Sequence, residues 1–426
     1  MTASAEFVDI PAARVPVHAR ADVLVVGGGA AGVAAAVAAA RRGAGTVLAE
    51  RGTYLGGLAT GGMIIALLTM DDGAGNQVVG GLCQETVDRM VARGAAHFPP
   101  PDEWGRDDET LIARNQEWLF VSGHGPHRVR YSVAYHPEEM KFAFEQMCVE
   151  AGVTMLYSTW GGEAIVSGDH LDGVVFQSKS GRFAVLADVV IDTTGDLDVL
   201  AAAGARHEKE KVLPWLWFTM SGVEDVGAAV GAAPGVFRTV GEGQVLVTWA
   251  ATERVSRFID ATDVDDITYA AVASREQVMK LYDSLRRDVP ALGRASLGHV
   301  ADQLDVTESR RLVGEYVLSR DDLDRRFEDT VAVTGHWTKY DCVYNVPYRS
   351  LLAREFDNAL AAGRCLSADH RAHHATKEIP ACMATGEAAG AAAALAVRTG
   401  LGLKDISRSR LRADLSDHGA ILERVE

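Results

Sequence analysis

Residues 21–50, ADVLVVGGGAAGVAAAVAAARRGAGTVLAE, decide the fold that this sequence predicts. The stretch begins with a short apolar run, residues 21–26, which is typical of a buried parallel strand. The alanine-rich residues 31–42 predict a helix that ends at Gly43, and residues 46–49 predict a second strand. A strand, a helix and a second strand in this order predict a Rossmann-like nucleotide-binding unit.

Three glycines with the spacing G-x-G-x-x-G join the first strand to the helix. Gly27 permits a tight turn, Gly29 lets the backbone approach a pyrophosphate, and Gly32 lets the helix pack closely on the strand. Ala30 and Ala31 lie at the start of the helix, where free N–H groups and the positive end of the helix dipole attract phosphates. The alternative is a glycine-rich turn that binds nothing, and the complete strand–helix–strand context disfavours it.

Glu50 closes the second strand, 21 residues after Gly29. A carboxylate there can bind both hydroxyls of an adenosine ribose, and it would repel the 2′-phosphate of NADP. This motif fits NAD and FAD equally well. The sequence then continues through Arg51 into a second glycine-rich loop, residues 56–62, whereas NAD dehydrogenases usually proceed into another strand–helix unit. The second loop is similar to the flavoprotein pattern, in which backbone reaches an extended FAD molecule, and it favours FAD.

Separated blocks of sequence carry a resemblance to a known family. Within them we expect a helix from about Pro137, a strand over residues 153–157 and a strand that ends before Thr194. The blocks resemble the FAD-dependent oxidoreductase family with the glutathione-reductase-like FAD fold, and most of all a broad bacterial group related to the flavoprotein subunits of fumarate reductase and succinate dehydrogenase. Besides residues 21–50, the blocks are YHPEEMKFAFEQMCVEAGVTMLYSTW (135–160), ADVVIDTTGDLDVLAAAGA (187–205), ESRRLVGEYVLSRDDL (308–323) and the run that begins NVPYRSLL (345–396).

The resemblance implies an α/β fold in which a Rossmann-like FAD-binding domain is interleaved with a substrate domain built on a mixed or antiparallel sheet. The runs LPWLWFTMSGV (213–223) and GQVLVTWAATE (243–253) predict strands of that second sheet, which would roof the flavin with a largely apolar pocket. The expected segments are 18–62, 131–205 and 345–403 for the FAD-binding domain, 63–130 and 206–344 for the substrate or cap domain, and 404–426 for a C-terminal helical segment.

The resemblance also implies which residues hold FAD. A turn at Gly363 and Arg364 would meet the ribityl chain, and a helix that starts at about Gly386 would point its positive N-terminus at the pyrimidine edge of the flavin. The loop LGGLATGG lacks the histidine of a histidyl–FAD bond, so non-covalent FAD is favoured, and the absence of a second strand-linked GxGxxG argues against a dedicated NAD(P)H domain. The expected contacts are Gly27, Gly29, Ala30, Ala31, Gly32, Glu50, Arg51, Gly56, Gly57, Leu58, Ala59, Thr60, Gly195, Asp196, Gly363, Arg364, Gly386, Ala388 and Ala389.

The stretch SADHRAHHATKEIPACM, residues 367–383, holds three histidines within five positions. One interpretation is a metal site, in which H-x-x-H supplies two ligands and Asp369 or Glu378 supplies a third. Pro380 and an expected extended backbone disfavour this site. A second interpretation is that one or two of the histidines are polar residues of a surface loop.

The interpretation that we favour is acid–base chemistry. In the relatives this connection lines the active site, where flavin N5 accepts a hydride while a base removes the partner proton. Lys377 would contact a substrate anion or flavin O2. His136 and Tyr135 are weaker candidates, because His136 also fits an ordinary helix start. The main candidates are, in order, His374, His373, His370 and Lys377.

The composition restricts the other classes of function. The formal net charge of −16 argues against nucleic acid and anionic membranes as the main partners. Five widely spaced cysteines without a C-x-x-C motif predict neither a disulfide framework nor a zinc ribbon, and they fit a reducing cytoplasm. The sequence predicts no signal peptide, and the apolar run of residues 30–40 is too short to span a membrane.

We therefore expect an FAD-dependent oxidoreductase of the dehydrogenase or oxidase type. It would oxidise or desaturate a small organic molecule by hydride transfer and pass the electrons to oxygen or another acceptor. The alternatives are a flavin monooxygenase that consumes NAD(P)H, a flavin-binding partner protein without turnover, and a colourless NAD-dependent dehydrogenase. A homodimer is compatible with the sequence, and the composition is associated with high-GC bacteria and with biosynthetic enzymes.

Overall fold

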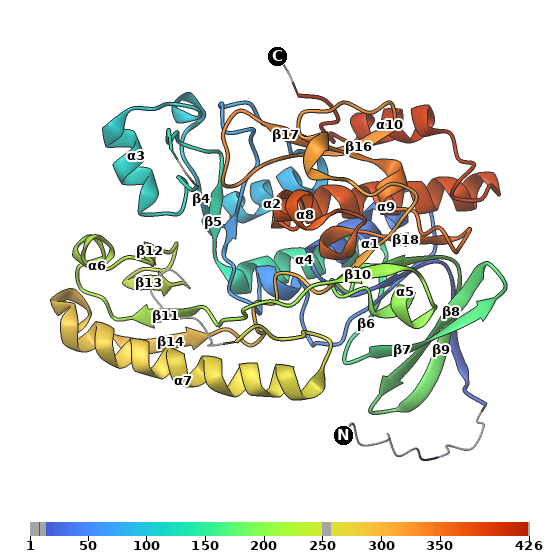
Figure 1. The fold of residues 1–426 in the computed structure, drawn as a ribbon, viewed down its shortest axis with the longest axis horizontal. Coiled ribbons are helices and arrows are strands. Elements are labelled where there is room, and N and C mark those ends of the chain that lie inside the picture. Colours follow the sequence, from blue (N-terminus) through green and yellow to red (C-terminus); the bar gives the residue numbers. More distant parts are fainter. Residues whose placement is uncertain (1–7, 9–13, 124, 249–256, 425–426) are drawn as a thin grey trace.

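The computed structural model describes residues 8, 14–123, 125–248 and 257–424. Its central sheet has the strand order β6-β2-β1-β9-β8-β7, and β18 also pairs with β9. The strands β6, β2, β1, β9 and β18 run parallel, while β8 and β7 extend the sheet in antiparallel fashion (Figure 1). The bounds are β1 Val17–Val26, β2 Thr46–Ala49, β6 Thr154–Leu156, β7 Trp160–Ser167, β8 His170–Ser178, β9 Gly181–Asp192 and β18 Ala359–Ala361.

The end of β1 is buried on both faces, as the sequence predicts. Val23 packs into the core that contains helices α1 (Ala30–Arg41) and α9 (Ile379–Thr399). Leu24 packs into a second core on the opposite face, together with side chains of β8 and β9. Because both faces are covered, the strand reads as a continuous apolar run and not as an alternation of apolar and polar residues.

Helices α1 and α9 pack closely because glycines of α9 face the backbone of α1. A Cβ atom at Gly386 would lie 2.1 Å from the carbonyl oxygen of Ala31, and one at Gly390 would lie 2.1 Å from that of Ala35. Among the described helices, α9 alone is long and apolar enough to cross a membrane by length and composition, but its most apolar window is 94% buried inside the protein. Its burial is that of a core helix.

The start of α9 differs from the expectation, which placed it at about Gly386. The helix begins at Ile379, with Glu378 as its N-cap and Pro380 in its first turn. Proline is favoured in a first turn, because its missing N–H would have no intrahelical partner there and its φ angle already suits a helix. Three of the predicted FAD contacts therefore lie in the buried interior of the helix: Gly386, Ala388 and Ala389.

The histidine-rich stretch also differs from the expectation, because it is helical and not extended. It forms α8 (His370–Thr376), whose N-cap Asp369 accepts the backbone N–H of Ala372 at 2.7 Å. An aspartate at this position satisfies an N–H group that has no partner within the helix. Two other predicted helices are confirmed, α4 (Pro137–Ala151) and α10 (Arg408–Asp417).

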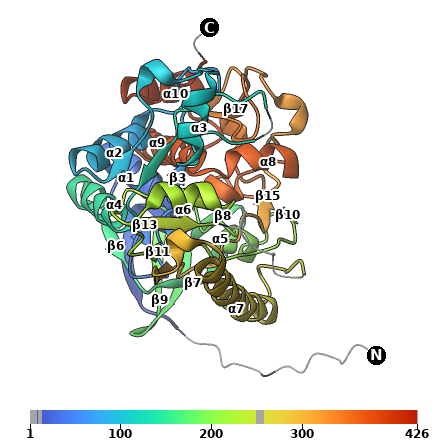
Figure 2. The same ribbon diagram turned by 90° about the vertical axis from the view of Figure 1, so that its left-hand side faces the viewer.

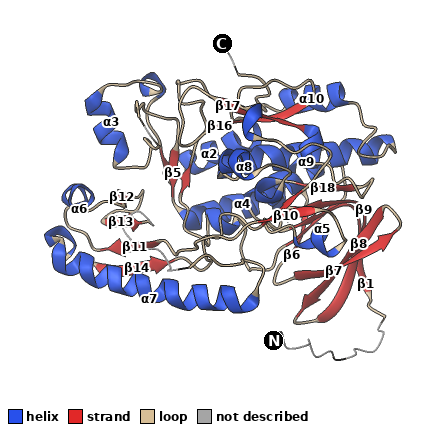
Figure 3. Ribbon diagram, viewed as in Figure 1, coloured by secondary structure: helices blue, strands red, loops and turns tan. Residues whose placement is uncertain are grey.

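A separate antiparallel sheet, with the order β12-β13-β11-β14, lies at the left of Figure 1. Helix α7 (Val264–Asp288) runs along this sheet (Figures 1 and 2), and Figure 3 shows that loops and short strands separate it from the central sheet. The strands predicted within residues 213–223 and 243–253 are confirmed, although residues 249–253 lie outside the described residues. The bounds are β11 Phe218–Ser221, β12 Val236–Arg238, β13 Gln244–Val247 and β14 Ser296–Val300.

The remaining described helices and strands include two- and three-stranded pairings outside these two sheets. One of them, the β16–β17 hairpin, carries the loop that faces α8. The remaining bounds are α2 Gly81–Ala92, α3 Glu109–Gln116, α5 Asp198–Ala202, α6 Val226–Ala232, β3 Ala66–Leu67, β4 Ala96–His97, β5 Val133–Tyr135, β10 His207–Lys209, β15 Arg310–Leu312, β16 Thr330–Gly335 and β17 Val343–Pro347.

Candidate active site

The first glycine loop joins β1 to α1 and leaves room for a ligand at one point. At Gly27 the φ angle is +101°, and a Cβ atom would lie 2.6 Å from the carbonyl oxygen of Thr193. A Cβ atom at Gly32 would lie 1.8 Å from the carbonyl oxygen of Gly27. At Gly29, in contrast, no described atom beyond its chain neighbours lies within 4 Å of a Cβ position. This open space beside the N-terminus of α1 fits a pyrophosphate.

Glu50 lies directly after β2, beside this loop. Its two carboxylate oxygens accept the N–H groups of Gly28 and Gly52, each at 2.6 Å. A carboxylate oxygen can accept a second hydrogen bond, so Glu50 retains capacity for ribose hydroxyls. Next to it, the guanidinium of Arg51 lies 5.2 Å from the centre of the exposed indole ring of Trp160. This end of the loop therefore suits the adenosine half of a dinucleotide.

The second glycine loop packs on the first. The N–H of Gly56 donates to the carbonyl oxygen of Gly28 at 2.8 Å, and the hydroxyl of Thr60 closes the loop by donating to the carbonyl oxygen of Leu55 at 2.7 Å. The predicted contacts of the two loops that stay half-exposed are Gly27, Gly29, Gly57 and Leu58. Those that are buried are Ala30, Ala31, Gly32, Glu50, Gly56, Ala59 and Thr60, whereas Arg51 is exposed.

Tyr135 and His136, the weaker catalytic candidates, support this loop and a neighbouring helix. The hydroxyl of Tyr135 lies 2.8 Å from the carbonyl oxygens of both Ala59 and Ile64. His136 is the N-cap residue of α4. The positions of both residues are explained by structural roles.

Gly195, Asp196, Gly363 and Arg364, four of the predicted FAD contacts, lie together at the carboxyl ends of β9 and β18. Nη2 of Arg364 lies 2.9 Å from Oδ1 of Asp196, and Gly195 lies so close that a Cβ there would be 2.7 Å from the same nitrogen. Nη1 of Arg364 is buried and has no hydrogen-bond partner within the described part of the chain. A buried donor without an acceptor costs free energy, so this nitrogen fits an oxygen of a bound cofactor.

The first turns of α9 lie over the same turn. The hydroxyl of Thr385 accepts the N–H of Gly363 at 3.1 Å, and Sγ of Cys382 lies 3.7 Å from a Cβ position at Gly363. The open glycine loop, Glu50 and the Nη1 atom of Arg364 thus fit FAD along one edge of the sheet, and we call these groups together the FAD cradle. When bound there, FAD supplies a two-electron acceptor.

Two of the three histidines of α8 are hydrogen-bonded to other groups of the protein. His373 is buried, and its Nε2 donates to the carbonyl oxygen of Arg364 at 2.9 Å; burial lowers its pKa well below the usual value, so the ring is neutral. His370 is exposed, and its Nδ1 lies 2.8 Å from Oε2 of Glu308. Within the described residues no group of three His, Cys, Asp or Glu side chains could hold a metal ion.

His374 belongs to an aromatic wall with the β16–β17 loop. Nε1 of Trp337 donates to Nδ1 of His374 at 3.2 Å and to its carbonyl oxygen at 3.0 Å, and the two rings lie nearly parallel. The ring of His336 also lies nearly parallel to that of His374, with centroids 6.4 Å apart. Burial lowers the pKa of both histidines to about 4. His374 is therefore neutral at pH 7, with its proton on Nε2 because Nδ1 accepts a hydrogen bond.

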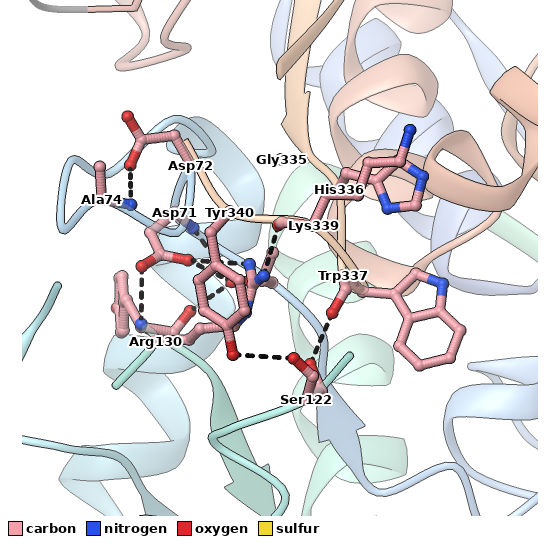
Figure 4. A network of polar contacts seen from close by, with 12 residues as sticks. Asp71, Asp72, Ala74, Ser122, Arg130, Gly335, His336, Trp337, Lys339 and Tyr340 are labelled. Atoms are coloured by element: carbon pink, nitrogen blue, oxygen red, sulfur yellow. Dashed lines mark hydrogen bonds and ion pairs between the residues drawn. The ribbon is translucent and has the colours of Figure 1, made fainter. Parts of the chain in front are cut away.

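A polar network fixes the loop that carries Trp337 (Figure 4). The buried guanidinium of Arg130 donates to the carbonyl oxygen of Lys339 at 2.5 Å and lies 4.0 Å from the centre of the Tyr340 ring. The hydroxyl of Tyr340 donates to the carbonyl oxygen of Ser122 at 2.8 Å, and the hydroxyl of Ser122 donates to that of Trp337 at 2.6 Å. These contacts give the aromatic wall a rigid backing.

Acidic side chains gather at the α9 end of the cradle. Lys377 and Glu378 link α8 to α9, and both are half-buried. Asp305 lies on the segment between β14 and β15, is 2% exposed, and donates its N–H to the carbonyl oxygen of Trp215 at 3.0 Å. Burial raises the pKa of Asp305 and of Glu378 to about 7, although the positive charge of Lys377 opposes both shifts. Carboxyl groups with pKa values near neutrality are suited to proton transfer.

Sequence reasoning missed Asp305 entirely and considered Glu378 as a metal ligand alone. Asp305 belongs to no motif, and its charged neighbours Lys377 and Arg364 lie far away in the sequence. The sequence offered one signal for Glu378, which is its position directly before a long apolar segment, where a buried acid at the start of a helix could be expected.

A comparison with protein families decides which family this is. Residues 22–415 match the family described as FAD dependent oxidoreductase. The chain belongs to this family. FAD is accordingly its cofactor and oxidoreduction its class of reaction, so the predicted fold, cofactor and enzyme class are confirmed. A comparison with curated protein sequences gives no significant match.

Solved structures that resemble the chain are distant. A geranylgeranyl bacteriochlorophyll reductase-like protein from Thermoplasma acidophilum is 15% identical with a TM-score of 0.46, over 94% of this chain and 83% of the other. An L-amino acid deaminase from Proteus myxofaciens is 12% identical with a TM-score of 0.47, over 94% and 95%. A p-nitrophenol 4-monooxygenase from Pseudomonas putida is 13% identical with a TM-score of 0.48, over 94% and 84%. These values are too low to transfer a substrate or a reaction.

Proposed function

We propose that this family member oxidises or desaturates a small organic molecule by hydride transfer to N5 of non-covalently bound FAD, and that oxygen or another acceptor reoxidises the flavin. The closer relation to fumarate reductase and succinate dehydrogenase flavoproteins remains a prediction of the sequence. So do the homodimer and the cytoplasmic location, the latter supported by five free, buried cysteines.

The observation that carries the proposal is a set of cationic groups near the start of α9, which lie beside Asp196 and the two acids with pKa values near neutrality. The N-terminus of α9, Lys377 and Arg364 all lie there. A reduced flavin carries negative charge, so these groups would favour its formation from the oxidised state. Cationic groups at this position therefore support a flavin that accepts a hydride.

The aromatic wall would orient the substrate. Neutral His374 can donate a hydrogen bond from Nε2, and Lys377 can pair with a substrate anion as a point charge. With a pKa near 4, His374 is too weak a base to hold the substrate proton at neutral pH. We therefore assign substrate contact to His374 and look for the proton acceptor elsewhere.

Anaerobic bleaching of the flavin tests the proposal. Panels of small alcohols, amines and carboxylic acids are screened with the FAD-loaded protein, and NADH and NADPH are screened in parallel. The expected result is bleaching by an organic substrate without nicotinamide, slowed at least tenfold in His374→Ala but not in the exposed-residue control His370→Ala. Rapid bleaching by NADPH, with no organic reductant active, would contradict the proposal and favour a monooxygenase.

A further inference from the structure

A cavity of about 700 Å³ beside the start of α10 collects positive charge in a chain whose formal net charge is −16. Its walls are the segment directly before β16, a residue after β17 and the first turns of α10, which packs against β16 (Figure 1). None of the described residues that line it is a predicted FAD contact. Two acids face the cavity, Glu328 and Asp329. Five arginines line it, and we call them the arginine cluster: Arg325, Arg326, Arg349, Arg408 and Arg412.

Aromatic rings hold three arginines of this cluster. The distances from the guanidinium carbon to the ring centre are 4.9 Å in Arg325–Phe327, 5.1 Å in Arg349–Tyr316 and 4.7 Å in Arg408–Tyr348. The rings of Tyr316 and Phe327 also contact each other edge-on, with centroids 5.3 Å apart. A guanidinium over an aromatic face keeps its in-plane N–H groups available to an anion. Because these side chains are already ordered, an anion that binds them loses less affinity to ordering entropy.

Direct contacts bring Arg349 and Arg412 to the start of β16. Nε of Arg349 lies 2.9 Å from Oδ2 of Asp329. Nη1 of Arg412 donates to the carbonyl oxygen of Thr330, which is the next residue. Two arginines that are far apart in the sequence therefore approach adjacent residues on one wall of the cavity.

Arg408 has no carboxylate partner among the described residues. Its Nη1 and Nη2 donate to the carbonyl oxygens of Ile406 and Lys404 at 2.6 and 2.7 Å. A guanidinium has further N–H groups that these two contacts do not use. Arg408 and Ser409 are also the first two residues of α10, so the positive end of the helix dipole adds to the charge of the cavity.

We propose that the arginine cluster binds a small molecule that carries two or more adjoining phosphate groups. A phosphate accepts paired N–H groups from one guanidinium, and adjoining phosphates suit arginines that come from three segments of the chain. Like charges around one cavity repel one another, and a bound polyanion removes that repulsion. The volume is that of a small-molecule site. The inference does not depend on the proposed oxidation, because the cavity and the FAD cradle share no described residue.

Titration calorimetry with inorganic pyrophosphate as the probe tests the proposal on the FAD-loaded protein, at low salt and without magnesium. The variants are Arg325→Gln and Arg408→Gln, which remove one cation from each of two walls. The control is Arg287→Gln at the end of α7, because the side chains of Arg325 and Arg287 are similarly exposed, at 59% and 69%. We expect saturable binding to the wild-type protein and the control, and a Kd higher by roughly tenfold or more in each cluster variant.

ATP and inorganic tripolyphosphate, used as further probes, distinguish two sources of the phosphates. A lower Kd for ATP would add a nucleoside to the recognised groups, and equal values would confine recognition to the phosphate chain. Both results support the site when Arg408→Gln weakens the binding.

No saturable binding of pyrophosphate, or equal Kd values in the control and in both cluster variants, would overturn the inference. The absorbance of bound FAD is followed in the same titration. Pyrophosphate that releases FAD would place the binding in the FAD cradle and would also overturn it. Should Arg408→Gln fail to fold, the Kd of Arg325→Gln, whose side chain is largely exposed, decides the result.

Discussion

Replacing Gly386 by alanine tests whether this glycine serves helix packing or flavin binding. In the structure a Cβ atom at Gly386 would lie 2.1 Å from the backbone carbonyl oxygen of Ala31, whereas ordinary contacts begin at 3.4 Å. The helices α1 and α9 would have to separate by about 1 Å, and overpacking of this kind costs roughly 1–3 kcal/mol or more. Alanine favours a helix by about 1 kcal/mol over glycine, which offsets part of this cost. We expect a net loss of roughly 2 kcal/mol.

Thermal unfolding of the FAD-free and the FAD-loaded protein measures this loss. Gly386→Ala should lower the Tm of both forms by several degrees. The matched control is Gly231→Ala in α6, where no described atom lies within 4 Å of the Cβ position, and it should be neutral or slightly stabilising. If Gly386→Ala kept the Tm of the FAD-free protein and lost FAD alone, the packing account would be refuted and the flavin contact predicted from the sequence would be restored.

Two further predictions concern buried acids. Glu50→Gln should raise the Kd for FAD roughly tenfold to a hundredfold, because hydrogen bonds to a charged acceptor contribute about 1.5–3 kcal/mol. Fluorescence titration measures the Kd, with the surface variant Glu85→Gln as the control, and an unchanged Kd would exclude a ribose contact. Glu387 is buried and accepts the N–H of Leu82 at 2.8 Å, and burial raises its pKa to about 7. Between about pH 4.5 and 7 the carboxyl group keeps its proton in the native state and loses it in the unfolded state, so the free energy of unfolding falls as the pH rises. Glu387→Gln should therefore raise the free energy of unfolding above pH 7 by up to about 3 kcal/mol and leave it unchanged at pH 4.5, as measured by denaturant unfolding. A gain that does not depend on pH would contradict this reasoning.

Local rules of sequence predict the FAD-binding core well. The turn at Gly27, the strand Thr46–Ala49 and the helix after His136 follow from steric and capping rules that act over a few residues. These rules also explain why the family resemblance covers most of the chain. The acid after the second strand is found by spacing alone, and the structure places Glu50 beside the glycine loop.

The features that the sequence did not predict have two physical causes. Some depend on local signals that favour different structures, and others depend on contacts between residues that are distant in the sequence. Pro380 suggested an interruption, but in a first turn proline promotes the helix, so both α8 and the start of α9 were missed. Gly386 suggested a helix start, whereas its place is fixed by the backbone of α1. The electrostatic influence of Lys377 on Asp305 arises from the fold of the whole chain, and no periodicity or motif encodes it.

The visible spectrum of the purified protein, repeated on the supernatant after acid precipitation, shows whether the protein binds FAD and whether the bond is covalent. We expect a yellow protein and a yellow supernatant that carries the flavin bands of released FAD. Colour that stays in the pellet would contradict the non-covalent binding. A colourless protein that also takes up no added FAD would contradict the assignment of the cradle itself.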